Sequence, residues 1–316
     1  MISFSRLQLS QKAQYEDILF ACPPRSCEYS FANLYLWGRQ EAAFFPGCVG
    51  FFSHFYGKSV YPYPIGTGNR RAVLDAILDD AKSRGIPCRF TSLTQAETQE
   101  LESWFPGRFL FRPDRDGFDY VYSIDDLADL KGRKFQKKRN HVHKFNNEHP
   151  DCQSVPLEKE NLPQAREMVD KWFRQRLAED PHGDYLLEQI ALSRAFRHFE
   201  SLGLEGLMLV ENGQVLAVTM ASRLSKNTMD VHFEKAQEDV DGAYAAVNCE
   251  FARHLRMMHP ELEFLNREDD MGLPGLRQAK LSYQPHHMEE KYCAYLAEGL
   301  HEEDDVENTL GSLLRG

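Results

Sequence analysis

The stretch from Asn266 to Tyr283 carries the residues of this sequence that are best suited to chemistry. Three consecutive carboxylates, Glu268, Asp269 and Asp270, follow a short apolar segment that ends at Asn266. Carboxylates crowded at a strand end perturb one another's titration, and they can hold an ammonium group or act as a general base. We predict Glu268 as catalytic and Asn266, Asp269 and Asp270 as substrate-binding. The alternative is that these acids stabilise the N-terminus of the next helix.

Arg277, Lys280 and Tyr283 follow at a spacing of three on a short predicted helix, 276–283. Residues three apart share one face of a helix. Lys280 could stabilise a developing oxyanion or a terminal phosphate, and Tyr283 could donate a proton to a leaving oxygen. We predict Lys280 and Tyr283 as catalytic and Arg277 as substrate-binding. Alternatively, Lys280 and Tyr283 are a structural pair that pins the helix to the sheet.

His232 and Glu234 alternate on one face of a predicted strand, 228–236, and are further candidates for substrate binding. A histidine on such a strand is more often a hydrogen-bonded partner than a base. The close histidine pairs, His286-His287 and His141-x-His143, do not have the spacing of metal ligands, and no two cysteines form a CxxC pair. The sequence therefore predicts no metal site.

A basic segment, 131–144, separates the two halves of the chain and contains seven Lys or Arg residues in 14. Phe135, Val142 and Phe145 give it a thin apolar stripe, which indicates a helix with one buried edge. The exposed cations would suit a polyanion, either an RNA backbone or a phospholipid head group. The predicted polyanion-binding residues are Arg133, Lys134, Lys137, Lys138, Arg139 and Lys144. The alternative is a solvated linker helix that pairs with acids elsewhere.

The loop 238–244 precedes a clearly amphipathic helix, which ends before Pro260. The start of a helix binds pyrophosphate, such as that of coenzyme A, through free backbone amides and the helix dipole, and nearby negative charge opposes this binding. Here Glu238, Asp239 and Asp241 would repel pyrophosphate. This loop disfavours coenzyme A and favours a different acyl donor.

The predicted elements alternate helices with strands in both halves, which indicates mixed α/β layers. The same order of elements recurs, so we expect two copies of one fold. A hairpin is predicted at Asn212-Gly213 and another at 46–48, and the last strand is predicted at 288–296. The expected domains are 1–125, a basic inter-domain helix 126–150, 151–296 and an acidic, solvated tail 297–316.

Bulk composition limits the function classes. A net charge of −11 over 316 residues disfavours a protein coated all over with nucleic acid. We see no signal peptide and no apolar run long enough for a membrane span, so we expect a cytoplasmic protein. Seven scattered cysteines indicate no disulfide framework.

Three motifs in order carry a resemblance to a known family. The sequence GLRQAKLSYQP at 275–285, with Lys291-Tyr292 after it, resembles the closing motif of the phosphatidylglycerol lysyltransferase C-terminal domain. Leu130-x-Gly132 with Lys138-Arg139 resembles that family's basic inter-domain segment, and SFANLYLW at 30–37 resembles a signature of its soluble branch. The resemblance implies two tandem acyltransferase-like (GNAT) domains and transfer of an amino acid from aminoacyl-tRNA.

These observations favour an aminoacyltransferase that takes its acyl group from aminoacyl-tRNA and requires no cofactor. The acceptor stays open between a lipid head group, a peptide and a small amine. One alternative is a coenzyme A-dependent N-acyltransferase, which would use acyl-coenzyme A. Another is a non-catalytic binding module on a decayed GNAT fold.

Overall fold

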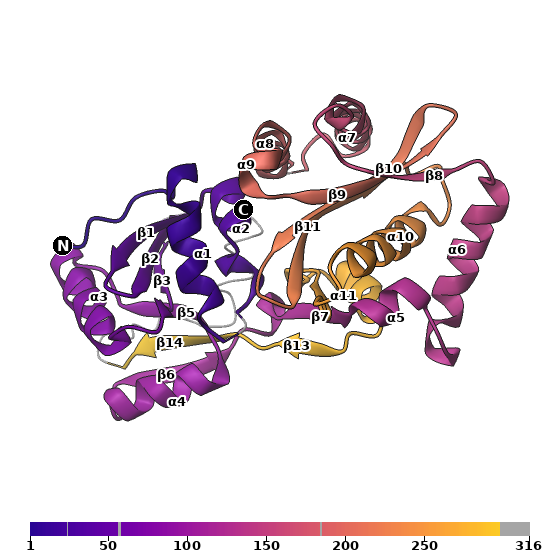
Figure 1. Cartoon of the computed structure of the whole chain (residues 1–316). Helices are drawn as coiled ribbons and strands as arrows, with labels where there is room; N and C mark the ends of the chain where they lie inside the picture. The colour runs from indigo at the N-terminus through magenta and orange to yellow at the C-terminus, as the bar shows by residue number, and fades with distance from the viewer. Residues whose placement is uncertain (24, 56–57, 184, 298–316) are drawn as a thin grey trace. The chain divides into compact units, whose positions relative to one another are not determined.

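The structure, a computed structural model, describes residues 1–23, 25–55, 58–183 and 185–297. The chain forms two compact units, one from residues 1–119, 269–277 and 288 onward, the other from 120–268 and 278–287 (Figure 1). Each unit contains a mixed sheet with flanking helices, which confirms the predicted α/β class. None of the helices that the structure describes is long and apolar enough to cross a membrane. The predicted acidic tail from residue 298 lies outside the described residues.

The sheet of the first unit has the strand order β1-β2-β3-β5-β14-β6, and β4 pairs with β2. Its strands are β1 (Gln40–Phe45), β2 (Cys48–Phe55), β3 (Lys58–Pro62), β4 (Ile65–Gly66), β5 (Arg89–Leu93), β6 (Phe109–Pro113) and β14 (Tyr292–Leu296). Its longer helices are α1 (Lys12–Phe20), α2 (Phe31–Trp37), α3 (Arg70–Arg84) and α4 (Gln95–Trp104). The predicted hairpin at 46–48 is confirmed as β1 and β2.

The sheet of the second unit has the order β13-β7-β12-β11-β10-β9-β8. Its strands are β7 (Asp119–Ser123), β8 (Gln153–Pro156), β9 (Glu205–Glu211), β10 (Gln214–Arg223), β11 (Thr228–Ala236), β12 (Phe264–Asn266) and β13 (His287–Glu289). The helices are α5 (Ile124–Asp129), α6 (Gln136–Glu148), α7 (Leu162–Glu179), α8 (Leu186–Arg197), α9 (Phe199–Leu202) and α10 (Ala243–Met258). The helix α11 (Pro274–Leu281) begins with residues of the first unit and ends with residues of the second. Asn212 and Gly213 both have positive φ, as the predicted hairpin between β9 and β10 requires.

Helices cover both faces of the second sheet, and the alternation of β11 shows which residues face which helix. The Lys235 ammonium lies 3.8 Å from the ring centroid of Trp172 on α7. The neighbouring Glu234 faces the other way and accepts a hydrogen bond from Asn248 on α10. Successive residues of a strand point to opposite faces, so α7 and α10 lie on opposite sides of the sheet (Figure 1).

Two strands lie in the sheet opposite to the one expected from the domain boundaries 1–125 and 151–296. β7, from the N-terminal half, lies between β12 and β13 in the second sheet, and β14, near the C-terminus, lies between β5 and β6 in the first. The single strand predicted at 288–296 is instead two strands, β13 and β14. Alternating hydrophobicity predicts a strand but does not say which sheet it completes.

The predicted basic inter-domain helix is α6, and it is part of the second unit. Its apolar stripe packs against α10 in a small buried cluster formed by Leu130, Phe135, Val142, Ala245 and Cys249. The predicted buried edge of this helix is therefore confirmed. Its remaining faces are polar and largely exposed.

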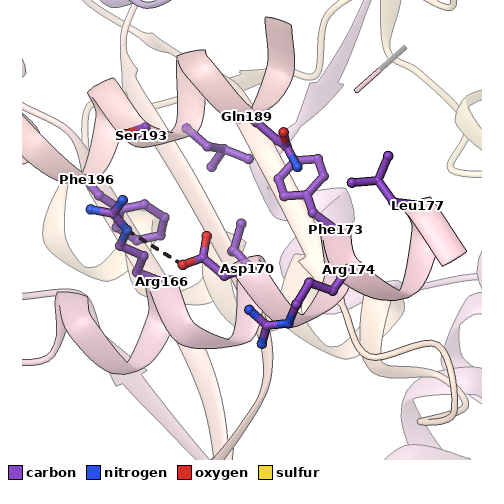
Figure 2. A pocket seen from close by; sticks show the side chains of 10 residues that line it. Arg166, Asp170, Phe173, Arg174, Leu177, Gln189, Ser193 and Phe196 are labelled. Carbon is purple, nitrogen blue, oxygen red and sulfur yellow. Dashed lines mark ion pairs between the residues drawn. The ribbon is translucent and has the colours of Figure 1, made fainter. Parts of the chain in front are cut away.

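A cavity of about 360 Å³ lies between α7 and α8 in the second unit (Figure 2). Phe173 and Phe196 line it together with other apolar side chains, and Arg166 and Arg174 lie at its edge. Arg166 forms an ion pair with Asp170, with 3.8 Å between Nε and Oδ2. Nothing in the sequence predicted this cavity.

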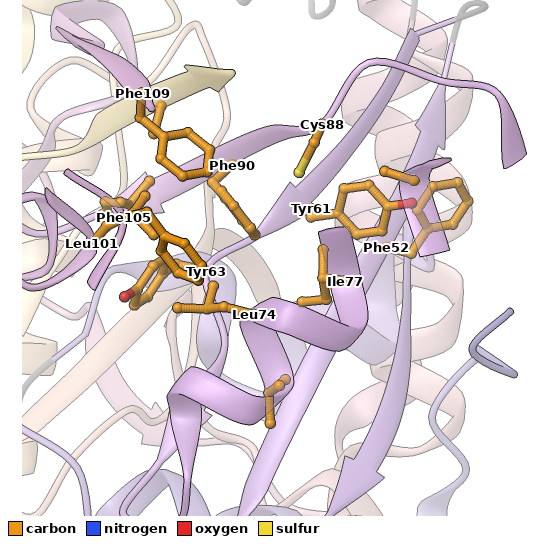
Figure 3. Close-up of a cluster of buried hydrophobic side chains, with 14 of the residues drawn as sticks. Phe52, Tyr61, Tyr63, Leu74, Ile77, Cys88, Phe90, Leu101, Phe105 and Phe109 are labelled. Carbon is orange, nitrogen blue, oxygen red and sulfur yellow. The ribbon is translucent and has the colours of Figure 1, made fainter. Parts of the chain in front are cut away.

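The interior of the first unit is a cluster of aromatic and aliphatic side chains (Figure 3). Phe90 on β5 is fully buried at its centre, and the ring centroid of Phe109 on β6 lies 5.7 Å away. Leu74 and Ile77 bring one face of α3 onto the same cluster.

The contact between α6 and α10 gives a stability prediction. Gly242 precedes α10 with φ +81°, and a Cβ there would lie 2.5 Å from the backbone oxygen of His141 on α6. Gly213 has a similar φ of +77° but has no neighbouring atom within 4 Å of such a Cβ. We expect Gly213→Ala to cost about 1 kcal/mol of unfolding free energy from backbone strain alone. Gly242→Ala should cost about 1–3 kcal/mol more, because the helices must also move apart.

Urea denaturation of both variants measures the difference, because they share the backbone strain and differ in the contact. Equal losses of stability would show that α6 does not press on the start of α10.

Candidate active site

The candidate site lies where β11 and β12 separate. The two strands pair in parallel over only three residues each, 228–230 with 264–266, although β11 continues to Ala236. β12 also pairs with β7 on its other side, and beyond Asn266 only these contacts continue: Arg267 N–H donates to the Tyr120 carbonyl, and Tyr120 N–H donates to the Glu268 carbonyl. The strands therefore diverge, and side chains fill the space between them. We call this space the opening between β11 and β12.

Arg267 is the central side chain of this opening. It is 13% exposed, and its Nη2 donates to Glu234 Oε1 at 2.8 Å. Glu234 is held from the other side by Asn248 Nδ2 at 3.2 Å. Arg267 Nη1 and Asn248 Oδ1 are both buried, and neither has a hydrogen-bond partner within the described residues. An unused donor and an unused acceptor in a buried place are hydrogen-bonding capacity for a ligand.

Two cations lie close to the ring of Tyr283. The guanidinium of Arg267 lies 4.6 Å and the ammonium of Lys138 3.7 Å from the ring centroid. Burial raises the pKa of Tyr283 to about 12, so the phenol stays protonated at neutral pH and can donate. Burial and the nearby Arg267 lower the pKa of Lys138 to about 8. Lys138 was predicted to bind a polyanion at the surface, but it points into this opening.

Lys280 holds the turn that carries Arg267. Its ammonium donates to the Arg267 carbonyl, and the Tyr122 hydroxyl donates to the Lys280 carbonyl at 2.8 Å. These contacts pin α11 to the end of β12. The structural alternative considered for Lys280 therefore has direct support, and Lys280 acts on the opening through Arg267.

The remaining predicted residues fall into two groups. His232, Glu234, Asn266 and Glu268 belong to the second unit, and His232 Nδ1 lies 3.4 Å from Glu268 Oε1. Asn266 Oδ1 accepts the Glu268 N–H at 2.7 Å, which fixes the direction of the chain.

Asp269, Asp270 and Arg277 belong to the first unit. Asp270 is fully buried, and its two oxygens accept from Arg277 at 2.8 and 2.9 Å. Arg277 also donates to Asp116 at 2.7 Å. Asp269 Oδ1 accepts the N–H of Met271 at 3.2 Å, within the same turn. The geometry of Asp270 and Arg277 favours a structural ion pair over substrate binding, because their polar atoms bind each other.

The predicted polyanion-binding side chains on and before α6 differ in how much of their charge is available. Lys134 pairs with Asp126, Lys144 pairs with Asp241, and Arg139 donates to the carbonyls of Leu130 and Gly132. Arg133 and Lys137 are exposed and form no ion pair with any described residue. The cationic face of this segment therefore depends mainly on these last two residues.

Sequence reasoning missed Arg267 and Asn248. Arg267 was inside the stretch that attracted attention, and an arginine directly after a short buried strand is itself a signal, because a buried guanidinium requires a partner. Asn248 gave no such signal, since it lies among the apolar residues of α10.

Comparison with known proteins agrees with this architecture. The chain is 34% identical to a conserved protein of unknown function from Bacteroides thetaiotaomicron, with a TM-score of 0.88 over 94% of this chain and 100% of that one. It has the fold of the L-PGS structure from Bacillus licheniformis, with a TM-score of 0.65, 16% identity, and coverage of 91% of this chain and 92% of that one.

An uncharacterised protein of Mycoplasmoides gallisepticum is 26% identical over 178 residues, 55% of this chain and 54% of that protein. The match thus spans about half the length of that relative. FemX has the same fold, with a TM-score of 0.58, 10% identity, and coverage of 93% of this chain and 97% of that one, which confirms the predicted α/β fold. A family model described as phosphatidylglycerol lysyltransferase, C-terminal, matches residues 21–295. The chain belongs to this family.

Proposed function

We propose that this protein transfers an aminoacyl group from aminoacyl-tRNA to a nucleophilic acceptor in the opening between β11 and β12. The observation that carries the proposal is the unused, buried Nη1 of Arg267 beside the Lys138 ammonium, which has no ion-pair partner within the described residues. Positive groups with free hydrogen-bonding capacity in a water-poor site stabilise the oxyanion of acyl transfer.

The proposed reaction forms a bond between the acceptor nucleophile and the acyl carbon and breaks the ester bond to the ribose oxygen of tRNA. Arg267 and Lys138 stabilise the negative carbonyl oxygen of the tetrahedral intermediate. Tyr283 donates its proton to the leaving ribose oxygen, and the proton that the acceptor loses restores the phenol. A phenol whose pKa is raised to about 12 suits this role, because a ribose hydroxyl is a similarly weak acid.

The start of α10 supports a donor other than coenzyme A. The backbone oxygen of His141 lies against Gly242, so closely that a methyl group would not fit. Asp241 and Glu238 lie in the same loop and pair with Lys144 and Arg176. A carbonyl oxygen and two carboxylates at a helix N-terminus oppose the binding of pyrophosphate.

The exposed cations of the α6 segment support tRNA as the carrier of the acyl group. Arg133 and Lys137 lie on the same segment as Lys138, whose ammonium enters the opening. A phosphate backbone bound along this segment would lie next to the opening that receives the aminoacyl end.

The direct test measures loss of a labelled amino acid from a panel of aminoacyl-tRNAs, with peptide amines, small amines and lipid head groups offered as acceptors. We expect the protein to accelerate transfer from at least one charged tRNA. A rate equal to the protein-free rate for all of them, together with a thermal shift by acetyl-coenzyme A, would support the coenzyme A-dependent alternative instead. If the protein neither accelerates transfer nor shows a thermal shift, this result would support the non-catalytic module.

Charge reversal at Arg133→Glu/Lys137→Glu should weaken tRNA binding at least tenfold. It should also reduce the slope of log Kd against log salt by about 1.5, because two phosphate contacts no longer release counterions. The matched control is Lys171→Glu/Arg174→Glu on α7, which reverses two exposed cations that form no ion pair among the described residues. Filter binding at several salt concentrations measures both. Equal losses in the two double variants would remove the special role of the α6 segment.

Loss of the Arg267 guanidinium should lower the transfer rate by about 10²–10³-fold, as for other oxyanion donors. Arg267→Met alone would leave Glu234 buried without its cation, so the variant to use is Arg267→Met/Glu234→Gln. Glu234→Gln alone is the control, since it keeps the guanidinium. A double variant with the rate of this control would exclude Arg267 from the chemistry.

The transfer rate should fall as pH rises through about 8, because Lys138, whose pKa is lowered to about 8, then loses its charge. Lys138→Arg keeps a positive charge at every pH used and should abolish this fall. The rates are measured after subtraction of the protein-free loss of the ester. Identical pH profiles for the two proteins would assign the fall to another group.

A further inference from the structure

Three potential metal ligands converge at the point where β11 and β12 separate. They are a carboxylate oxygen of Asp230, Nδ1 of His232 and a carboxylate oxygen of Glu268, and all three lie within 4.8 Å of one another. Asp230 and His232 share one face of β11, and Glu268 follows β12. We propose that these residues form a site for a divalent cation, and that Zn²⁺ is the ion whose chemistry fits it best.

The distances suit a tetrahedral ion. His232 Nδ1 lies 3.4 Å from Asp230 Oδ2 and 3.4 Å from Glu268 Oε1. Ligand atoms on a tetrahedron lie about 3.4 Å apart when the bonds to zinc are about 2.1 Å long. Two of the three separations therefore already match a tetrahedral arrangement. Three protein ligands leave one position open, as in zinc sites that bind water or a substrate.

The surroundings of the ligands also resemble those of metal sites. His232 Nε2 lies 2.8 Å from Ser222 Oγ, and a hydrogen bond at the other ring nitrogen fixes the orientation of a metal-bound histidine. The side chains of Asp230 and His232 are fully buried, whereas Glu268 is 23% exposed. Two ligands are thus held in place, and the third lies at the edge through which an ion can enter.

A second cluster in the first unit provides a comparison. Cys27, Glu28 and Asp119 also bring three potential ligand atoms within 4.8 Å of one another. There the Lys291 ammonium lies 2.6 Å from oxygens of both Glu28 and Asp119, so a cation of the chain itself already takes the central place. In the cluster of Asp230, His232 and Glu268, the nitrogen is an imidazole, which is a metal ligand when neutral.

A divalent ion would offset the negative charge of the two carboxylates. The bound ion would tie β11 to the chain after β12 at their point of divergence. This role goes beyond the proposed transfer reaction and does not depend on it, because binding can be measured without turnover.

The test is calorimetric titration of the full chain with Zn²⁺ after dialysis against a chelator, with thermal unfolding followed in parallel. We expect one ion per chain and a higher melting temperature in its presence. Co²⁺ in place of Zn²⁺ should give the intense visible absorption of a tetrahedral complex.

Glu268→Gln and His232→Gln should each weaken binding at least tenfold, and Glu268 is the safer variant for folding because its side chain reaches the surface. Glu28→Gln, in the cluster filled by Lys291, should bind Zn²⁺ as the unchanged protein does. Binding that persists in both Glu268→Gln and His232→Gln would overturn the proposal. If the unchanged protein does not bind Zn²⁺, the proposal is also overturned. The cluster is then a histidine paired with two carboxylates.

Discussion

The backbone hydrogen bonds between Tyr120 and the residues after β12 determine the form of the second unit. The short strand β12 lies between β11 and β7 and pairs with both, but beyond Asn266 the chain keeps only its hydrogen bonds to β7. Among the described residues, β11 therefore has no strand partner on that side from residue 231 onward, and side chains occupy the space. The candidate active site lies at this loss of one partner.

The charges that meet in this opening do not cancel. Arg267 forms an ion pair with Glu234, while the Lys138 ammonium lies against the ring of Tyr283 and forms no ion pair among the described residues. Burial without an ion-pair partner destabilises the charged form of Lys138, and its pKa is lowered for this reason. Groups in this condition gain most from a negative charge that develops during a reaction.

The sequence predicted those features that depend only on residues close together in the chain. The 3.6-residue spacing along 244–258 and the Asn212-Gly213 turn gave α10 and the β9–β10 hairpin. Lys280 was correctly placed on a helix, but Tyr283 lies in the turn after α11, which ends at Leu281. The partner of Tyr283 could not be predicted, because Lys138 is more than 140 residues away in the chain.

Local patterns also failed in specific ways. Three adjacent acids indicated one substrate site, yet Glu268 belongs to the second unit while Asp269 and Asp270 belong to the first. The expectation of no metal site, which stays a prediction, rested on histidine spacing and so considered only ligands that are neighbours in sequence. Asp230, His232 and Glu268 come together through the pairing of two strands, which no spacing rule records.

The position of β14 between β5 and β6 has a consequence for synthesis. A ribosome releases β5 and β6 when about a third of the chain has been made, but the strand that joins them is residues 292–296. Until those residues emerge, β5 and β6 expose unpaired edges, and such edges bind other chains. The second unit needs nothing beyond residue 289 for its sheet. We therefore infer that the N-terminal unit is the last to complete its fold, although it is the first to be made.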